Sequence, residues 1–220
     1  MSEDFFENQT IEIKPKKTNE TKDIIIAWLG ISICFALVLG GYNLFNLAKF
    51  KNFSITDFVL FLVVSLVVTG TAFILHELAH KYSGIYFGAK AKFVKWNKPL
   101  YFAIFFAFIF GFVFVAPGAV YIFGKRLSIK ENGIISAVGP ITNIILAGIF
   151  LLLAIIINTN SIIVSMIFSL GILINLWISF FNLLPIGPLD GKAIFLWSPF
   201  LWVVLMVISI GGYLFLSGII

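Results

Sequence analysis

The sequence predicts an all-α polytopic membrane protein, and three observations support that fold class. Of its 220 residues, 60% are hydrophobic and 11% are charged, and the mean hydropathy is +1.08. A soluble domain averages about 45–50% apolar and about 25% charged residues. The apolar residues form continuous runs instead of the alternating pattern of a transmembrane β-barrel. The single cysteine, Cys34, excludes an internal disulfide scaffold.

Four uncharged runs supply about five membrane-crossing helices, because one crossing takes about 20 apolar helical residues. We expect the second run to continue as a helix through the polar residues 76–81. The third run accommodates two crossings with a turn at residues 158–161. The runs cover residues 24–48, 58–75, 132–189 and 193–220.

The chain before the first run differs in composition. Residues 1–23 carry ten charged side chains and few apolar ones, which predicts a disordered tail. Its acidic start, with no short apolar core and cleavage site after it, argues against a signal peptide. We therefore divide the chain into this tail and one membrane domain, residues 24–220.

One apolar stretch, residues 99–124, is harder to assign. It is rich in Phe, Val and Ile, is broken by Pro117-Gly118, and is marginal for a crossing. We treat residues 100–116 as a re-entrant or surface-lying segment. Because β-branched and aromatic residues favour strands, we predict a short strand region at residues 112–123.

The sequence His-Glu-Leu-Ala-His begins at His76. Positions i and i+4 share one helix face, so His76 and His80 can bind one metal ion, and Glu77 can reach a water on that metal. A catalytic zinc needs a third protein ligand. The candidate is Asp190, the only carboxylate between Glu131 and the C-terminus. The alternatives are that the histidines only hydrogen-bond to neighbouring helices, and that Asp190 only caps a helix.

A shared metal constrains the topology. His80 and Asp190 must lie near the same membrane face, so an even number of crossings separates them. The run 132–189 supplies two, and residues 100–116 therefore do not cross. That arrangement places thirteen of the fifteen Lys and Arg residues on one side, whereas a full crossing divides them nine to six. Positive residues concentrate on the cytoplasmic side, so we expect the metal site and N-terminus there and the C-terminus outside.

Two asparagines, Asn143 and Asn175, lie within predicted crossings. Amide side chains in membrane helices commonly form hydrogen bonds between helices. We therefore expect each of them to contact a neighbouring helix, in preference to a catalytic role.

These motifs resemble those of the site-2 protease family, the intramembrane zinc metalloproteases. The resemblance rests on HELAH at residues 76–80 and NLLPIGPLDG at residues 182–191, with intervening segments at 117–121 and 136–140. It covers roughly residues 58–195, which form the expected core of the domain. The two metal motifs, in this order and inside apolar segments, are highly specific.

The resemblance implies roles for five residues. His76, His80 and Asp190 look like zinc ligands, Glu77 looks like the general base, and Asn182 matches an asparagine that helps to hold the substrate or the oxyanion. The implied activity is zinc-dependent hydrolysis of peptide bonds in or near transmembrane segments. The implied partners are a transmembrane protein substrate and the lipid bilayer, and no nucleic acid is expected. The oligomeric state, the substrate and its regulation stay open.

The remaining expectations concern location and alternatives. No soluble stretch is long enough for a PDZ-like domain, and the chain resembles compact family members of archaea and bacteria. We therefore expect a multi-pass protein of a prokaryotic cell membrane. A catalytically inactive, metal-binding pseudoprotease that binds transmembrane clients is the main alternative, and a small ion transporter is another. The presence of Glu77 favours the enzyme, since a pseudoprotease could lose its base.

Overall fold

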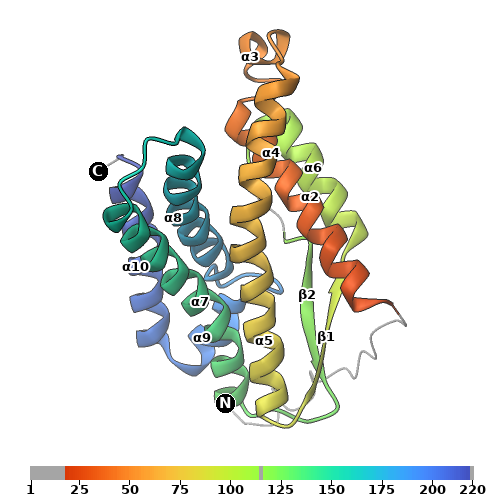
Figure 1. Ribbon diagram of the computed structural model, residues 1–220. Coiled ribbons are helices and arrows are strands. Elements are labelled where there is room, and N and C mark those ends of the chain that lie inside the picture. Colours follow the sequence, from red (N-terminus) through yellow and green to blue (C-terminus); the bar gives the residue numbers. More distant parts are fainter. Residues whose placement is uncertain (1–17, 114–115, 219–220) are drawn as a thin grey trace.

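The computed structural model describes residues 18–113 and 116–218. In this part of the chain, five helices are long and apolar enough to cross a membrane (Figure 1), and a small antiparallel sheet accompanies them. The predicted all-α polytopic fold is confirmed. The crossing helices are α2 (Glu20–Gly40), the continuous helix formed by α4 (Ile55–Thr69), η1 (Gly70–Ile74) and α5 (Leu75–Tyr86), then α7 (Ile129–Ile156), α8 (Ile162–Asn182) and α10 (Pro199–Leu216). The shorter elements are α3 (Leu47–Lys51), β1 (Lys90–Lys95), α6 (Asn97–Phe110), β2 (Gly118–Phe123) and α9 (Asp190–Trp197).

The first helix starts earlier than its uncharged run. The side chain of Asn19 accepts a hydrogen bond from Lys22 N at 3.2 Å and caps the helix. Helix α2 thus begins at Glu20, inside the segment predicted as a tail, and residues 1–17 of that segment lie outside the described residues. The helix ends at Gly41, whose φ of +67° favours glycine.

The last uncharged run contains one crossing helix, as predicted, but that helix begins at Pro199 and not at residue 193, because the run is divided between α9 and α10. Ser198, between α9 and α10, is extended, with φ −148° and ψ 90°. The ring of Pro199 disfavours a helical conformation at the residue before it, and proline is well suited to the first turn of a new helix. Ser198 also caps that new helix by accepting from Leu201 N. Residues 219–220 lie outside the described part of the chain.

The two ends of the ambiguous apolar stretch meet. Helix α6 packs along α2 and reaches the loop that follows α2, where Leu44 N donates to Phe108 O at 3.1 Å. Trp96 N donates to Pro117 O at 2.8 Å, so the two ends of the stretch lie side by side. The stretch thus extends along α2 and ends next to where it began, which is compatible with the predicted absence of a full crossing. Its packing against α2 favours the re-entrant alternative over the surface-lying one.

The two strands are only partly anticipated by the sequence. Strand β2 begins at Gly118; residues 112–113, predicted to be strand, are not, and residues 114–115 lie outside the described residues. Strand β1, which the sequence analysis missed, pairs with it in an antiparallel register that sets Phe93 opposite Val120. Lysines alternate with Ala91 and Phe93 over residues 90–93 of β1, and this short pattern is the signal that could have revealed it.

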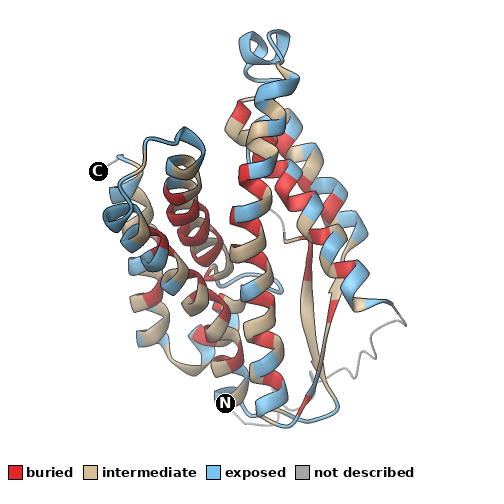
Figure 2. Cartoon of the chain, in the orientation of Figure 1, coloured by how far each residue is buried: buried red, intermediate tan, exposed pale blue. Residues whose placement is uncertain are grey.

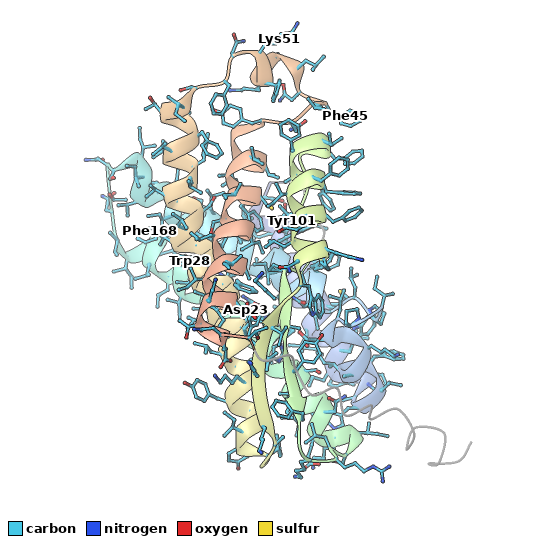
Figure 3. The ribbon with its side chains drawn as sticks, turned by 90° about the vertical axis from the view of Figure 1, so that its right-hand side faces the viewer. Asp23, Trp28, Phe45, Lys51, Tyr101 and Phe168 are labelled. Atoms are coloured by element: carbon cyan, nitrogen blue, oxygen red, sulfur yellow. The ribbon has the colours of Figure 1, made fainter. Side chains whose placement is uncertain are left out.

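Buried residues gather where the helices face one another (Figure 2). Many large apolar side chains are nevertheless exposed. Large exposed apolar surfaces mark interaction with a membrane or a partner. Lys51 lies at the α3 end of the molecule, and Asp23 lies toward the opposite end (Figure 3). The strands and the start of α7 are at the end away from α3 (Figure 1).

Candidate metal centre

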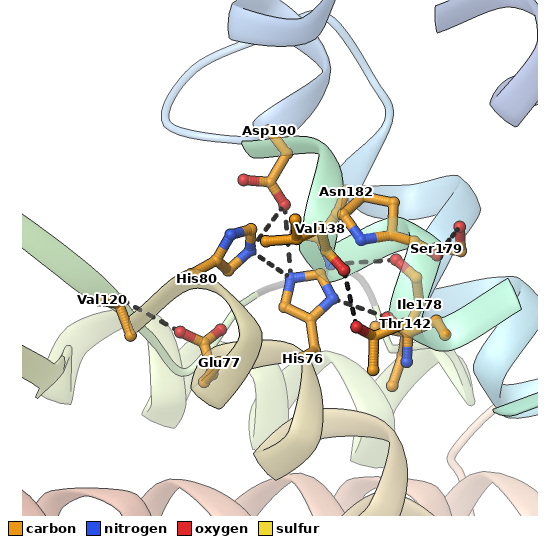
Figure 4. A network of polar contacts seen from close by, with 12 residues as sticks. His76, Glu77, His80, Val120, Val138, Thr142, Ile178, Ser179, Asn182 and Asp190 are labelled. Atoms are coloured by element: carbon orange, nitrogen blue, oxygen red, sulfur yellow. Dashed lines mark hydrogen bonds and ion pairs between the residues drawn. The ribbon is translucent and has the colours of Figure 1, made fainter. Parts of the chain in front are cut away.

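Three predicted ligands from distant parts of the chain meet in one place (Figure 4). Helix α5 presents both histidines of the HELAH motif on one face, with His76 Nε2 and His80 Nε2 2.9 Å apart. Asp190 Oδ2, at the start of α9, lies 3.4 Å from His76 Nε2 and 3.2 Å from His80 Nε2. Ligand atoms of the three residues all lie within 4.8 Å of one another. The three side chains are therefore positioned to bind a metal ion.

Glycines bring the surrounding backbone close enough to form this centre. At Gly191, an added Cβ would lie 2.0 Å from Leu183 O, so only a glycine lets the start of α9 fold back against the end of α8. At Gly139, an added Cβ would lie 2.4 Å from His80 Nε2 and 2.7 Å from His76 Cε1. Helix α7 thus packs directly against both imidazoles. The sequence pairs Asp190 with Gly191 for this steric reason.

Hydrogen bonds determine which imidazole nitrogen faces the centre. His80 Nδ1 lies 2.7 Å from Ile135 O, a backbone carbonyl that can only accept, so Nδ1 carries the proton. His76 Nδ1 lies 2.6 Å from Asn143 Oδ1 and carries its proton for the same reason. Both Nε2 atoms are therefore lone-pair donors toward the centre. This is the usual orientation of metal-binding histidines, whose other nitrogen donates a hydrogen bond.

The donor set fits a cation. Two unprotonated imidazole nitrogens and a carboxylate oxygen converge, and such acceptors repel one another unless a proton or a metal ion lies between them. Burial by itself raises the pKa of the Asp190 carboxyl. In the metal-free centre a proton on His80 takes the place of the cation, and its charge, together with hydrogen bonds from the histidines, outweighs burial and lowers that pKa to about 2. The carboxylate is thus ionised at neutral pH, which is the form that binds metals. Two imidazoles and one carboxylate are a common ligand set of catalytic zinc.

The geometry favours metal binding over the alternative roles of these residues. The N-cap of α9 is Leu189, and Asp190 is the first residue within the helix, so Asp190 is not a cap. The histidine Nδ1 atoms do contact α7, but their Nε2 atoms face each other and Asp190. Contacts with α7 therefore account for only one nitrogen of each ring, and the other nitrogen is directed at the carboxylate of Asp190.

Two further predicted residues, Glu77 and Asn182, line the cavity that the three candidate ligands also line. The cavity has a volume of about 340 Å³, and Trp96 and Tyr121 form part of its wall. Glu77 is buried, and its Oε2 accepts a hydrogen bond from Val120 N of strand β2 at 3.1 Å. Asn182, the last residue of α8, lines the cavity while its Nδ2 donates to Ile178 O within its own helix at 3.0 Å.

The asparagines expected to link helices do so, and one of them reaches the metal centre. Asn143 contacts His76, Ala72 and Asn175 with its side chain. Sequence reasoning predicted the contacts between helices and missed the contact with His76. The signal available was an amide in the apolar helix directly after the segment at residues 136–140. The hydrogen bond between His80 and the carbonyl of Ile135 could not be predicted from residue types, because every residue has a backbone carbonyl.

Comparison with known proteins agrees with this geometry. No family model matches the chain, and no solved structure gives a significant match. The chain is 36% identical over 200 residues to a protein of Methanocaldococcus jannaschii named "Putative zinc metalloprotease MJ0611", and the match covers 90% of this chain and 94% of that protein. Identity at this level over nearly the full length of both chains shows common ancestry and a common fold. The chain therefore belongs to a family of zinc metalloproteases.

Proposed function

We propose that this protein is an intramembrane endopeptidase of the site-2 protease type, which uses zinc to hydrolyse peptide bonds in or near transmembrane segments. The observation that carries the proposal is the place of the site in the bundle. His76, Glu77 and His80 lie in a continuous apolar helix of 32 residues, and Asp190 completes the set from the segment between two other long apolar helices. A protease centre built from such helices has its substrates at membrane depth.

Each predicted residue has a part in the reaction. A bound zinc ion supplies Lewis acidity and makes water a nucleophile near neutral pH. His76, His80 and Asp190 hold the ion. The Glu77 carboxylate takes the proton from the attacking water and passes it to the departing amine nitrogen. The Asn182 amide donates to the oxyanion that develops on the scissile carbonyl, once it leaves its contact with Ile178.

The sheet offers a means of holding an extended substrate. Val120 N points away from β1 and toward the site, where it meets Glu77. Backbone groups on that side of β2 are therefore not used by the ladder and line the cavity. A peptide must be unwound from its helix before attack, and addition to a strand edge is a common way to bind an unwound segment. A short amphipathic connector is the alternative, and the cavity contact of β2 favours strand addition.

The orientation in the membrane follows from the basic residues. Lys49 and Lys51 lie in α3, at one end of the molecule, whereas β1, at the other end, carries Lys90 and two further lysines. Because positive residues concentrate on the cytoplasmic side, we propose that the metal centre lies toward the cytoplasmic side of a prokaryotic membrane.

The test is cleavage by Glu77→Gln, with Glu131→Gln as the matched control. Glu131 lies in the first turn of α7, where it pairs with Lys125 at 2.8 Å and does not line the cavity. Purified variants in proteoliposomes are offered a library of single-span substrates, and product masses locate the bond. We expect Glu77→Gln to lose about 10²–10⁴-fold in cleavage rate with its zinc content unchanged, because general-base catalysis contributes that much.

Three results would contradict the proposal. Equal cleavage by wild type and Glu77→Gln would remove the assigned base. Zinc binding by the wild type without cleavage of any substrate would favour the pseudoprotease. Cleavage of soluble peptides alone, with single-span substrates left intact, would show a metalloprotease that does not work within membranes.

A further inference from the structure

A chain of buried amides leads from the metal centre into the middle of the bundle. His76 Nδ1 lies 2.6 Å from Asn143 Oδ1, Asn143 Nδ2 donates to Asn175 Oδ1 at 2.9 Å, and Asn175 Nδ2 donates to Gly171 O at 2.8 Å. Asn143 and Asn175 are completely buried. The chain joins α5, α7 and α8 in one line of hydrogen bonds.

Each amide in this chain has only one orientation available. Gly171 O only accepts, so Asn175 turns its NH₂ group to that carbonyl and its oxygen to Asn143. Asn143 then meets two acceptors, Asn175 Oδ1 and Ala72 O, and its NH₂ group serves both. Its oxygen is left facing His76. Reversal of either amide would bring acceptors together inside an apolar bundle, which is costly.

The Ala72 contact connects this chain to an irregular helical turn. Ala72 belongs to η1, a π-helical turn directly before the HELAH motif. Asn143 therefore contacts the same continuous helix at two levels, the carbonyl of Ala72 and the ring of His76 one turn later. Single π-helical turns are rare within α-helices and are frequent at functional sites. Here the π-helical turn places the carbonyl of Ala72 against Asn143, the same residue that contacts the ring of His76.

We propose that Asn143 is a positioning residue that sets the tautomer and ring orientation of His76 for metal binding, and that Asn175 sets the orientation of Asn143. The proposal rests on the ligand role of His76 within the proposed function. Partners behind metal ligands typically contribute 10–100-fold to metal affinity. Asn143 is the side-chain partner of His76, whereas His80 relies on the carbonyl of Ile135, so mutation can test only the His76 contact.

The experiment measures zinc affinity by competition with a chelator, and the visible spectrum of the Co²⁺ form, in detergent-purified protein. We expect Asn143→Ala to lose about 10–100-fold in affinity, with a smaller loss in Asn175→Ala. The matched control is Ser179→Ala, which removes an equally buried contact between helices, to Pro140 O and Ser209 Oγ, with no link to His76. It should bind zinc as the wild type does.

A second variant separates positioning from a purely structural role. Asn143→Asp keeps an acceptor for His76 but sets a carboxylate against Ala72 O and Asn175 Oδ1. If Asn143 acts through His76, Asn143→Asp binds zinc more tightly than Asn143→Ala does. The metal-free form of Asn143→Asp should nevertheless unfold at a lower temperature than that of Asn143→Ala. Equal or greater loss of affinity in Asn143→Asp would overturn the proposal, as would unchanged affinity in Asn143→Ala. Zinc affinity is measured without a substrate, so a protein that fails to cleave any substrate still tests this proposal. The variant His76→Ala tests separately whether His76 is a zinc ligand.

Discussion

The close packing of α7 against the metal centre makes Gly139 the most informative position for substitution. In Gly139→Ala, the new Cβ would lie 2.4 Å from His80 Nε2, 2.6 Å from His80 Cε1 and 2.7 Å from His76 Cε1. Non-bonded heavy atoms normally approach to about 3.5–4.0 Å, so the rings or the helix must move by about 1 Å. Both rings are rigid and are held at Nδ1 by α7 itself. The displacement therefore falls on the metal ligands.

The size of this displacement determines the expected loss. Metal–ligand distances tolerate only about ±0.2 Å, several times less than the required movement. A misplacement of about 1 Å at a catalytic site can cost about 10²-fold in rate. We expect Gly139→Ala to lose zinc affinity and to lower kcat/KM by at least about 10²-fold.

The control lies on the same helix. Gly148 also belongs to α7, and an added Cβ there would meet no atom within 4 Å. Gly148→Ala should therefore retain zinc and activity. Zinc affinity by chelator competition and cleavage of a single-span substrate are measured for both variants, together with helix content by circular dichroism. If Gly139→Ala matched Gly148→Ala in zinc affinity and cleavage, the inferred contact between α7 and the imidazoles would be wrong.

Three other predictions concern the ligand set, the strand edge and the topology. Asp190→Ala should purify with little zinc, because two imidazoles alone leave the ion one protein ligand short; full occupancy by metal analysis would exclude its ligand role. Val120→Pro removes the N–H group that donates a hydrogen bond to Glu77 but spares the hydrogen bonds between β1 and β2, since that N–H faces away from β1. The value of kcat/KM should fall about tenfold or more at unchanged zinc content. An unchanged kcat/KM would show that this contact is not used in catalysis. Single cysteines placed at Lys95 and Ser128 should react with an impermeant thiol reagent from the same membrane side, whereas labelling from opposite sides would mean that the segment between them crosses.

Much of the fold was predictable because membrane helices obey a local rule. In hydrocarbon, each backbone polar group must find a partner within its own segment, so a long uncharged run forms a helix whatever its neighbours are. The runs at 132–189 and 58–75 illustrate this, since both contain crossing helices as expected. The break at Ser198-Pro199 also has a local cause, because Pro199 is the first residue of a helix and proline is favoured at that position. Strand β1 has only a short local pattern, and its formation depends on β2, a partner elsewhere in the chain.

The metal centre shows the same division. The spacing of His76 and His80 predicts a shared ion from helix geometry alone, and the assumption that Asp190 binds the same ion requires an even number of crossings between it and His80. Neither argument predicts which residues hydrogen-bond to the two histidines. Asn143 lies 67 positions from His76 in the chain, and the backbone carbonyl of Ile135 is chemically like any other. Such contacts depend on how three helices pack, which no local pattern encodes.

The amino-acid sequence by itself thus determined the membrane class, the number of crossings and the identity of the candidate metal-binding side chains, because these depend on composition and on spacing along one helix. The tertiary structure decided how the ligands are oriented, where the re-entrant segment returns and how Glu77 meets strand β2. Those features arise from contacts between distant segments, and their geometry is set by the close approach of helices at glycines such as Gly139 and Gly191.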